Sequence, residues 1–377
     1  MHFYIRHFDP LLFNVIYFSY IICEVAVMKI TDFGKTKDGR MARLFTLTNG
    51  KGFEAAVTDF GGIVQAIRVP FKDGVTDVVL GYDSAAGYEN GTEYLGATVG
   101  RTCGQVEGGE FCIGNAVYLL TQNMGEHNMH GGEKGFSYTY FEAQEPMRDD
   151  ELVLKRFSPD GEEGFPGNVE LTVTYRVTDD CALEIHYDAV TDKTTILDVT
   201  NHSYFNLDGW DKDTDCLEHW LKINADSFCE TDNIGMPTGV ITEVEGTPMD
   251  FRQFHRIGER IEDEYAQLHT NDGYDHNYNL NGGSSLGKAP VIEVENGVRT
   301  HRLEVYTDYP GVQLYTGNSL RTNEADLGKG GKPFRYRQAL CLETQYPTNA
   351  MAHPEFPSII LMPGEKYNKT CIYKFIG

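Results

Sequence analysis

In this chain of 377 residues, two side chains are candidates for an acid and a base that act together. His202 follows a strand-like run that ends at Thr200, and an imidazole exchanges a proton near neutral pH. Glu343 interrupts an otherwise apolar run that begins at Ala339, where a carboxylate must be paired, hydrogen-bonded or functional. Because partial burial raises the pKa of a carboxyl group, Glu343 is a candidate general base. Such a pair is the minimum for moving protons on and off a sugar ring.

The neighbours of His202 indicate what kind of ligand it meets. Asn201 and Asn206 offer amides that both donate and accept hydrogen bonds, and Tyr204 and Phe205 offer aromatic faces. This mixture predicts the floor of a site for an uncharged ligand with many hydroxyl groups. The alternative is a core histidine whose nitrogens are satisfied by hydrogen bonds at the end of a strand.

Two glycine-rich segments add candidate ligand contacts. In 99–111, Arg101 offers a bidentate donor, but the spacing matches neither phosphate-binding fingerprint. In 123–136, His127 and His130 lie three residues apart. The surrounding glycines disfavour a helix and the spacing suggests no third ligand, so a metal site is disfavoured. We expect His130 to hydrogen-bond a ligand hydroxyl as a neutral imidazole.

Two later segments are also rich in hydrogen-bonding side chains. Asp275, in 272–280, either binds a pair of hydroxyl groups or caps a turn, and the sequence leaves both open. Gln313 and Tyr315 lie in 310–318 and are similar in kind.

Short strands must position these residues. From Met28 onward, apolar or alternating runs are punctuated by Gly, Asn and Asp, and Asn49-Gly50 predicts a hairpin turn. The run Val169 to Val177 alternates almost perfectly, as in a half-buried antiparallel strand. Helical signals are short, and the strongest covers Ile257 to Tyr265. Because no linker or composition shift divides 28–377, we predict a single all-β domain of antiparallel sheets packed face to face.

Residues 1–27 differ from this pattern, because they are mostly apolar from Leu11 to Val27. The end of this run makes a poor signal-peptide cleavage site, and Glu24 would be costly inside a membrane-spanning helix. Met28 opens a self-consistent first strand. We therefore expect 1–27 to be upstream sequence outside the folded domain, with a signal peptide or a membrane anchor as alternatives, and no membrane role for 28–377.

The composition limits the partners. Hydrophobic residues make up 41% of the chain, which is ample for a large core, and 32 Lys plus Arg against 56 Asp plus Glu give a formal charge of −24. A field of that sign repels nucleic acid and anionic membranes and does not help to bind phosphorylated substrates. A neutral small molecule fits best. The eight cysteines are scattered, so we expect reduced thiols in a cytoplasmic protein.

Ten motifs, taken in order, make residues 28–377 resemble the aldose 1-epimerase (galactose mutarotase) family. The motifs are Gly100-Arg101 with the glycine-rich loop that follows, Asn128-Met-His-Gly-Gly, Glu163-Gly-Phe-Pro-Gly, Thr200-Asn-His-Ser-Tyr-Phe-Asn-Leu, Pro237-Thr-Gly, Gly246-Thr-Pro-Met-Asp-Phe-Arg, Gly273-Tyr-Asp-His-Asn, Tyr315-Thr-Gly-Asn, Leu342-Glu-Thr-Gln and Pro363-Gly-Glu-Lys-Tyr. Each motif alone is weak, but ten in sequence order are very specific. Residues 1–27 lie outside the family pattern.

The resemblance implies a β-supersandwich that uses neither a metal nor an organic cofactor and acts on a free aldose. We expect a monomer or a homodimer, and the sequence does not distinguish them. By motif, Glu343 takes the proton from the anomeric hydroxyl and His202 protonates the ring oxygen. The ring opens to the aldehyde, the C1–C2 bond rotates, and closure gives the other anomer. His130 and Asp275 match positions that bind substrate hydroxyls, and Gln313 is a weaker match for a residue lining the cleft.

One departure from the family concerns the sugar contacts. The family usually has Asn-Arg where this chain has Gly104-Gln105. Gln105 keeps a hydrogen-bond donor but loses the charge and the planar fork of arginine. Arg101 belongs to the preceding motif position and cannot be assumed to replace that arginine. Gln105 and Arg101 are therefore both candidate substrate contacts, and the preferred aldose stays open.

Three other functions are compatible with parts of the sequence. An epimerase for a phosphorylated or otherwise modified hexose would need a basic cluster for a phosphate, which the acidic composition disfavours. A carbohydrate-binding protein without turnover would fit the Gly104-Gln105 change, whereas the intact His202 and Glu343 argue against it. A polysaccharide lyase or hydrolase is disfavoured, because no second carboxylate lies in a motif that would pair with Glu343 for glycoside hydrolysis.

Overall fold

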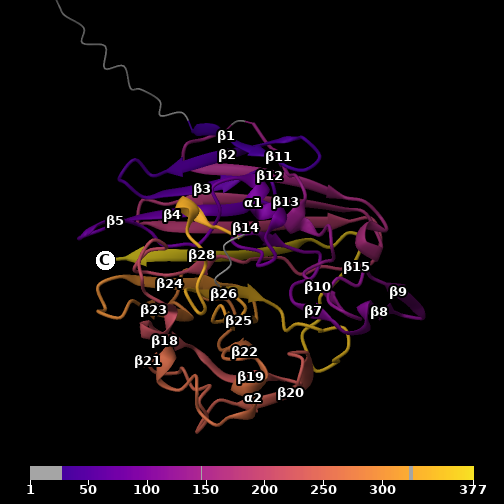
Figure 1. Cartoon of the computed structure of the whole chain (residues 1–377). Coiled ribbons are helices and arrows are strands. Elements are labelled where there is room, and N and C mark those ends of the chain that lie inside the picture. The colour runs from indigo at the N-terminus through magenta and orange to yellow at the C-terminus, as the bar shows by residue number, and fades with distance from the viewer. Residues whose placement is uncertain (1–27, 146, 322–325) are drawn as a thin grey trace, which may run out of the picture.

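Antiparallel strands dominate the computed structural model, which describes residues 28–145, 147–321 and 326–377. Sheets of five, nine and six strands account for most of the strands. Figure 1 shows the strands stacked across the molecule, from β1 and β2 at the top to β19, β20 and α2 at the bottom, with β28 near the middle. The prediction made for residues 1–27 lies outside the described residues.

The five-stranded sheet is built from consecutive hairpins. In sheet order its strands are β1 (Lys29–Lys35), β2 (Met41–Thr48), β3 (Glu54–Thr58), β4 (Ile63–Phe71) and β5 (Gly74–Asp77). The predicted hairpin turn joins β2 to β3. There the Oδ1 of Asn49 accepts hydrogen bonds from the backbone N–H groups of Lys51 and Phe53, and Gly50 takes a φ of 69°.

The nine-stranded sheet combines segments from across the sequence. In sheet order its strands are β11 (Glu142–Ala143), β12 (Glu151–Ser158), β13 (Val169–Val177), β14 (Ala182–Thr191), β28 (Tyr367–Ile376), β24 (Arg302–Thr307), β23 (Ile292–Glu295), β18 (Trp220–Ile223) and β21 (His255–Arg256). The strand predicted from alternation at 169–177 is confirmed as β13, whose residues alternate between buried and more exposed positions.

The six-stranded sheet has one face in the core and the other turned away from it. In sheet order its strands are β17 (Tyr204–Phe205), β26 (Leu340–Gln345), β25 (Gly311–Tyr315), β22 (Asp275–Leu280), β19 (Ala225–Thr231) and β20 (Pro237–Glu243). Leu340 and Leu342 of β26 join the main hydrophobic core together with Phe45 of β2 and Val173 of β13. The core therefore lies between the sheets, and the all-β sandwich predicted from the sequence is confirmed.

Short elements complete the described fold. Two-stranded pairs are formed by β6 (Thr98–Val99) with β16 (Thr200–Asn201), β7 (Gln105–Val106) with β10 (Asn128–Met129), β8 (Glu110–Ile113) with β9 (Ala116–Leu119), and β15 (Thr195–Ile196) with β27 (Ile360–Leu361). The helices are α1 (Ala85–Asn90) and α2 (Ala266–Thr270), with 3₁₀ turns at Glu107–Gly109, Phe136–Tyr138, Glu162–Gly164, Cys216–Glu218, Ile257–Glu259 and Lys329–Gly331. None of the helices in the described ranges has the length and apolar character needed to cross a bilayer.

The helix predicted over Ile257 to Tyr265 was wrong in its extent. Only the first three residues form a 3₁₀ turn, and α2 begins after Tyr265. Gly258 weakens the helical tendency of this segment. It also packs so closely on Leu217 that an added Cβ would lie 2.9 Å from the Cβ of Leu217, so tertiary packing fixes the local backbone here.

Candidate active site

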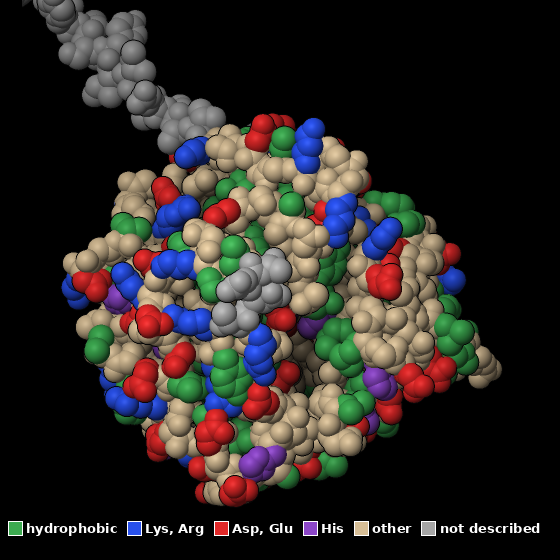
Figure 2. Space-filling model, viewed as in Figure 1, with side chains coloured by type: hydrophobic (Ala, Val, Ile, Leu, Met, Phe, Trp, Pro, Cys, Tyr) green, Lys and Arg blue, Asp and Glu red, His purple; other side chains and the backbone are tan. Residues whose placement is uncertain are grey.

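A cavity of about 400 Å³ opens against the six-stranded sheet and has the size of a small-molecule site. Side chains from β19, β22, β25 and β26 line it, together with residues of the loops that carry Tyr94 and His130. The hollow near the middle of the face drawn in Figure 2 contains histidine atoms and has acidic atoms beside it.

The pleat of the sheet decides which side chains reach the cavity. Because side chains alternate along a strand, Glu343 and Gln345 of β26 face the cavity while Leu342 faces the core. Asn277 of β22 lies opposite Gln313 of β25, which in turn lies opposite Glu343. The register thus places three polar side chains in one row across the cavity floor.

His202 and Glu343 meet in this cavity, as the sequence suggested. The Nε2 of His202 lies 3.6 Å from the Oε1 of Glu343, and their side chains are only 6% and 3% exposed. His202 lies between β16 and β17, and β17 pairs with β26, which brings the imidazole to the carboxylate. The Oε2 of Glu343 is buried and has no hydrogen-bond partner among the described residues, so this oxygen is free to bind a ligand.

Burial opposes charge on both members of the pair. Desolvation lowers the pKa of His202 to about 4. Desolvation, helped by the charge of Asp275, raises the pKa of Glu343 well above its ordinary value. Between these two pKa values the pair holds a single proton. A pair with one proton can take a proton from a ligand at one atom while it gives a proton to the ligand at another.

A thiol contacts the other nitrogen of the histidine. The Sγ of Cys341 lies 3.5 Å from the Nδ1 of His202. Burial raises the pKa of the Cys341 thiol well above its ordinary value, so the sulfur keeps its hydrogen and can donate it to Nδ1. In a neutral ring this contact leaves the remaining hydrogen on Nε2, the nitrogen that faces Glu343.

His130 faces the same space and is suited to donate. Its Nδ1 accepts a hydrogen bond of 3.1 Å from the backbone N–H of Gly104, so its hydrogen lies on Nε2. Burial and the nearby His202 lower the pKa of His130 well below its ordinary value, which keeps the ring neutral. Possible ligand atoms of His130, His202 and Glu343 lie within 4.8 Å of one another. Because the Nε2 of His130 carries hydrogen in this arrangement, the trio suits a hydroxyl ligand better than a metal ion.

Asp275 and Gln313 also line the cavity, and they contact each other. The Nε2 of Gln313 donates a hydrogen bond of 2.7 Å to the Oδ1 of Asp275. Desolvation raises the pKa of Asp275 to about 6, although this hydrogen bond opposes the shift. The Oε1 of Gln313 is buried without a partner among the described residues. The sequence left open whether Asp275 caps a turn, and the structure instead places it on β22 beside the cavity.

Arg101 does not line the cavity, and the prediction that it contacts the ligand is corrected here. Its side chain is fully enclosed, and its Nε donates to the Oγ of Ser158. The remaining guanidinium nitrogens donate to the backbone carbonyls of Ser158, Pro159 and Pro166. The planar fork that suggested ligand binding is thus used to join β12 to the loop before β13.

Replacing Arg101 by methionine should therefore affect stability and not ligand binding. We expect the free energy of unfolding to fall by about 3 kcal/mol or more, because buried acceptors lose their donors. The affinity of the folded variant for an aldose should stay within about twofold of the wild type, since no described contact links Arg101 to the cavity. Urea unfolding and calorimetric titration measure the two quantities. If the variant is as stable as the wild type but binds the aldose more weakly, Arg101 does contact the ligand.

Gln105 lies on β7 and does line the cavity, and its Nε2 is 4.0 Å from the Sδ of Met124. The adjacent Gly104 stands where the family that the sequence resembles usually has asparagine. Gly104 has a φ of 61°, and an added Cβ would lie 1.9 Å from the Cγ2 of Thr348. An asparagine at 104 would therefore need Thr348 to move.

Asn277 and Gln345 are cavity residues that sequence reasoning missed. Both amide groups are buried, and neither nitrogen nor oxygen of either has a partner among the described residues. Buried amides normally have partners, so this arrangement points to a ligand that supplies them. The spacing in the sequence could have indicated both residues, because side chains two positions apart on a strand share a face. Asn277 lies two residues after Asp275, and Gln345 lies two residues after Glu343.

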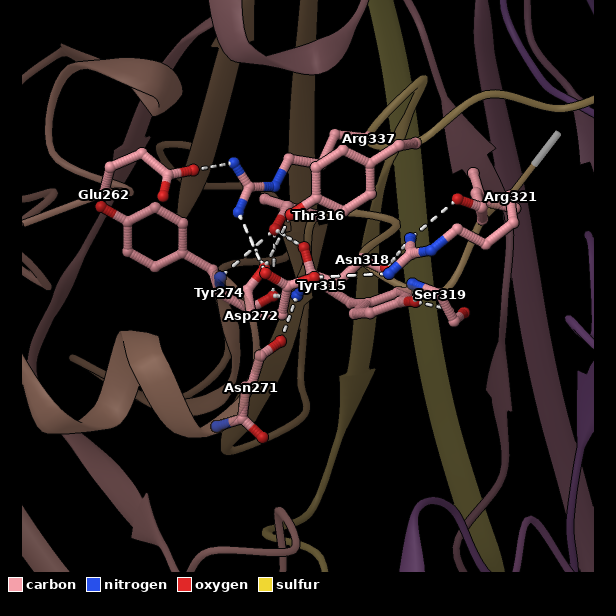
Figure 3. A network of polar contacts seen from close by, with 12 residues as sticks. Glu262, Asn271, Asp272, Tyr274, Tyr315, Thr316, Asn318, Ser319, Arg321 and Arg337 are labelled. Atoms are coloured by element: carbon pink, nitrogen blue, oxygen red, sulfur yellow. Dashed lines mark hydrogen bonds and ion pairs between the residues drawn. The ribbon is translucent and has the colours of Figure 1, made fainter.

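A polar network behind one wall fixes Tyr315, which lines the cavity (Figure 3). The backbone N–H of Ser319 donates to the hydroxyl oxygen of Tyr315 at 2.7 Å. The Nδ2 of Asn318 donates to the carbonyl of Asn271 at 2.9 Å, which ties this turn to the loop before β22. Figure 3 shows Arg337 bridging the side chain of Glu262 and this loop, so the wall is held from behind.

Comparisons with known proteins agree with this geometry. A family model described as Aldose 1-epimerase matches residues 43–374. A galactose mutarotase from Bos taurus is 37% identical over 320 residues, covering 85% of this chain and 90% of the relative. An aldose 1-epimerase from Escherichia coli is 33% identical over 345 residues, covering 90% and 97%.

Solved structures of two similar proteins share the fold. A GalM/aldose epimerase homologue from C. elegans superposes with a TM-score of 0.80 at 28% identity, covering 89% of this chain and 99% of that one. A galactose 1-epimerase from Lactobacillus acidophilus superposes with a TM-score of 0.79 at 29% identity, covering 93% and 98%.

Proposed function

This chain belongs to the aldose 1-epimerase family, and from that premise we propose that Glu343 and His202 are its catalytic base and acid. The protein is an isomerase that interconverts the α and β anomers of a free hexose. The observation that carries the assignment is the free, buried Oε2 of Glu343 beside an imidazole whose Nε2 lies 3.6 Å from the same carboxylate.

The proposed steps conserve protons. In the reacting form of the pair, the single proton has passed from Glu343 to His202. Glu343 then takes the proton of the C1 hydroxyl while Nε2 of His202 gives one to the ring oxygen. The C1–O5 bond breaks and C1 becomes an aldehyde. After the C1–C2 bond rotates, the proton on the C5 hydroxyl returns to His202 and Glu343 protonates the aldehyde oxygen as the ring closes. Closure on the opposite face of C1 gives the other anomer.

The other polar residues of the cavity would hold the sugar during rotation. The Nε2–H of His130 is available to donate to a sugar hydroxyl, and the carboxylate of Asp275 is available to accept. Gln105, Gln313 and the two unpartnered amides of Asn277 and Gln345 can each donate and accept. A neutral ligand rich in hydroxyl groups is the class that satisfies such a set.

The alternatives fit the cavity less well. No lysine or arginine of the described chain lines it, so a phosphorylated hexose would find no countercharge there. A binding protein without turnover needs no acid and base in contact, whereas this cavity holds both. We also propose a cytoplasmic location, since all the cysteines among the described residues are free thiols, as is usual in reducing compartments.

Polarimetry on freshly dissolved α-D-galactose and α-D-glucose tests the proposal. The protein should speed the approach to an unchanged final rotation, and the two rates give its preference between the sugars. If the folded protein binds both sugars without accelerating either, the catalytic assignment fails and a binding protein is the better description.

The rate should depend on pH at both extremes, because only a pair with one proton can act. Activity should fall towards acid pH, because His202 has a pKa of about 4 and its protonation gives the pair two protons. It should fall towards alkaline pH as Glu343 loses its proton above its raised pKa. The profile counts protons on the pair, whichever member holds them. Polarimetric rates, corrected for the spontaneous reaction at each pH, provide the measurement, and a flat profile would exclude the pair.

A further inference from the structure

The cavity carries acidic groups and no described basic ones. Glu93, Asp275 and Glu343 line it, and none of the described lining residues is a lysine or an arginine. His130 adds no positive charge at neutral pH, because burial lowers its pKa. The His202–Glu343 pair holds a single proton and is neutral overall, so Glu93 and Asp275 make the cavity acidic. The whole chain, at −24, adds a field of the same sign. A cationic ligand would therefore be attracted and an anionic ligand repelled.

Glu93 is held at the wall of the cavity. Its Oε2 accepts a hydrogen bond from the Oγ of Ser319, and that Oγ lies 2.6 Å from the hydroxyl oxygen of Tyr315. The carboxylate is thus fixed beside the ligand space by the same turn that fixes Tyr315. Gln105 also lines the cavity, and its uncharged amide adds no positive charge there.

The carboxylates on the floor repel each other when both are ionised. The charge of Asp275 makes ionisation of Glu343 harder, which adds to the effect of burial. A positive group bound next to Glu343 would offset this repulsion. The free Oε2 of Glu343 is the acceptor that such a group would use.

The chemistry of the sugar places that positive group at C2. The substituents on C1 and C2 are neighbours on the ring, so a carboxylate that takes the proton from the C1 hydroxyl can accept a hydrogen bond from the C2 substituent with its other oxygen. We propose that the cavity takes hexoses with a protonated amino group at C2 as substrates at least as good as the neutral hexoses, and discriminates against hexoses with an anionic group. This inference rests on the proposed function of Glu343.

The test compares three sugars of the galactose series. We would measure the enzyme-catalysed kcat/KM for anomer exchange of D-galactose, 2-amino-2-deoxy-D-galactose and D-galacturonate at neutral pH. The amino sugar should equal or exceed galactose, and the uronate should be lower by about tenfold or more, as expected for gain or loss of a charged contact. An amino sugar about tenfold worse than galactose, or a uronate as good as galactose, would overturn the proposal.

Variants separate the charge of the cavity from the charge of the whole chain. Glu93→Gln removes a lining charge and Gln105→Arg adds an opposing one, so each should lower the ratio of amino sugar to galactose by about threefold to tenfold. Glu264→Gln is the matched control, because Glu264 does not line the cavity and its side chain is 97% exposed. An equal fall of the ratio in the Glu264 variant would show that the cavity is not responsible.

A binding experiment keeps this inference apart from the proposed function. 1,5-Anhydro-D-galactitol and its 2-amino-2-deoxy analogue lack an anomeric hydroxyl and cannot change anomer. Calorimetric titration should show tighter binding of the amino analogue by about tenfold. If no sugar is turned over but this difference is present, the catalytic assignment fails and the charge preference stands. If galactose is turned over but the two analogues bind equally, the catalytic assignment stands and the charge preference fails.

Discussion

Replacement of Glu343 by glutamine is expected to lower kcat for anomer exchange by about 10²–10⁴-fold. Glutamine has nearly the same shape and can still hydrogen-bond a sugar hydroxyl, but it cannot accept the proton of the C1 hydroxyl. KM should therefore change much less than kcat, within about threefold. Polarimetry with galactose over a range of concentrations measures both constants. A variant that keeps more than about a tenth of the wild-type kcat would remove Glu343 from the mechanism.

The stability of the Glu343→Gln variant shows whether its loss of activity is caused by unfolding. Burial raises the pKa of Glu343 above its unfolded value. The protonated group therefore contributes stability that is fully present below the unfolded pKa and is lost as the pH rises through the folded pKa. Glutamine does not titrate, so the variant should melt at the same temperature as the wild type or higher above neutral pH. Thermal melts followed by circular dichroism at several pH values check this.

Several strands and the two residues of the proposed acid–base pair could be predicted from the sequence because their signals are local. The alternation at 169–177 gave β13, and the dipeptide Asn49-Gly50 gave the turn between β2 and β3. Glu343 was singled out because a carboxylate in an apolar run needs a reason to be there, and His202 because an imidazole exchanges a proton near neutral pH. Their contact, however, depends on the pairing of β17 with β26, more than 130 residues apart in sequence.

The residues that sequence reasoning placed wrongly or missed depend on distant partners. The guanidinium of Arg101 could reach a ligand or nearby carbonyls, and only the fold brings Ser158 and Pro166 to it. Asn277 and Gln345 became visible only when the face of the sheet that lines the cavity was known. Once that face is known, the alternation of side chains along β22 and β26 places both residues on it.

The departure at 104–105 also has a cause that lies elsewhere in the chain. A side chain at 104 would collide with Thr348, which follows β26 by three residues. The residue type tolerated at 104 therefore depends on a residue beyond β26. Whether Gln105 alters the sugar preference is a separate question that the comparison of galactose with amino sugars addresses.

Replacement of His202 by asparagine is the second large effect that we expect, again about 10²–10⁴-fold in kcat. Asparagine can donate a hydrogen bond to the ring oxygen but cannot transfer a proton to it. His130→Asn is a matched control in the same cavity, because His130 is proposed to hold a hydroxyl and its loss should raise KM by about tenfold with a smaller change in kcat. Equal kcat losses in the two variants would mean that His202 has no special role.

The pH dependence of the residual rates separates the two roles most sharply. In His202→Asn the remaining catalysis needs ionised Glu343, so its rate should rise with pH through the raised pKa of that carboxyl group and then stay level. In Glu343→Gln it needs protonated His202, so its rate should fall as the pH rises through the pKa of the imidazole. The variant with both changes should be about as slow as either single variant, because two groups that act as a unit are not additive. Parallel pH profiles in the two single variants would contradict the assignment of one base and one acid.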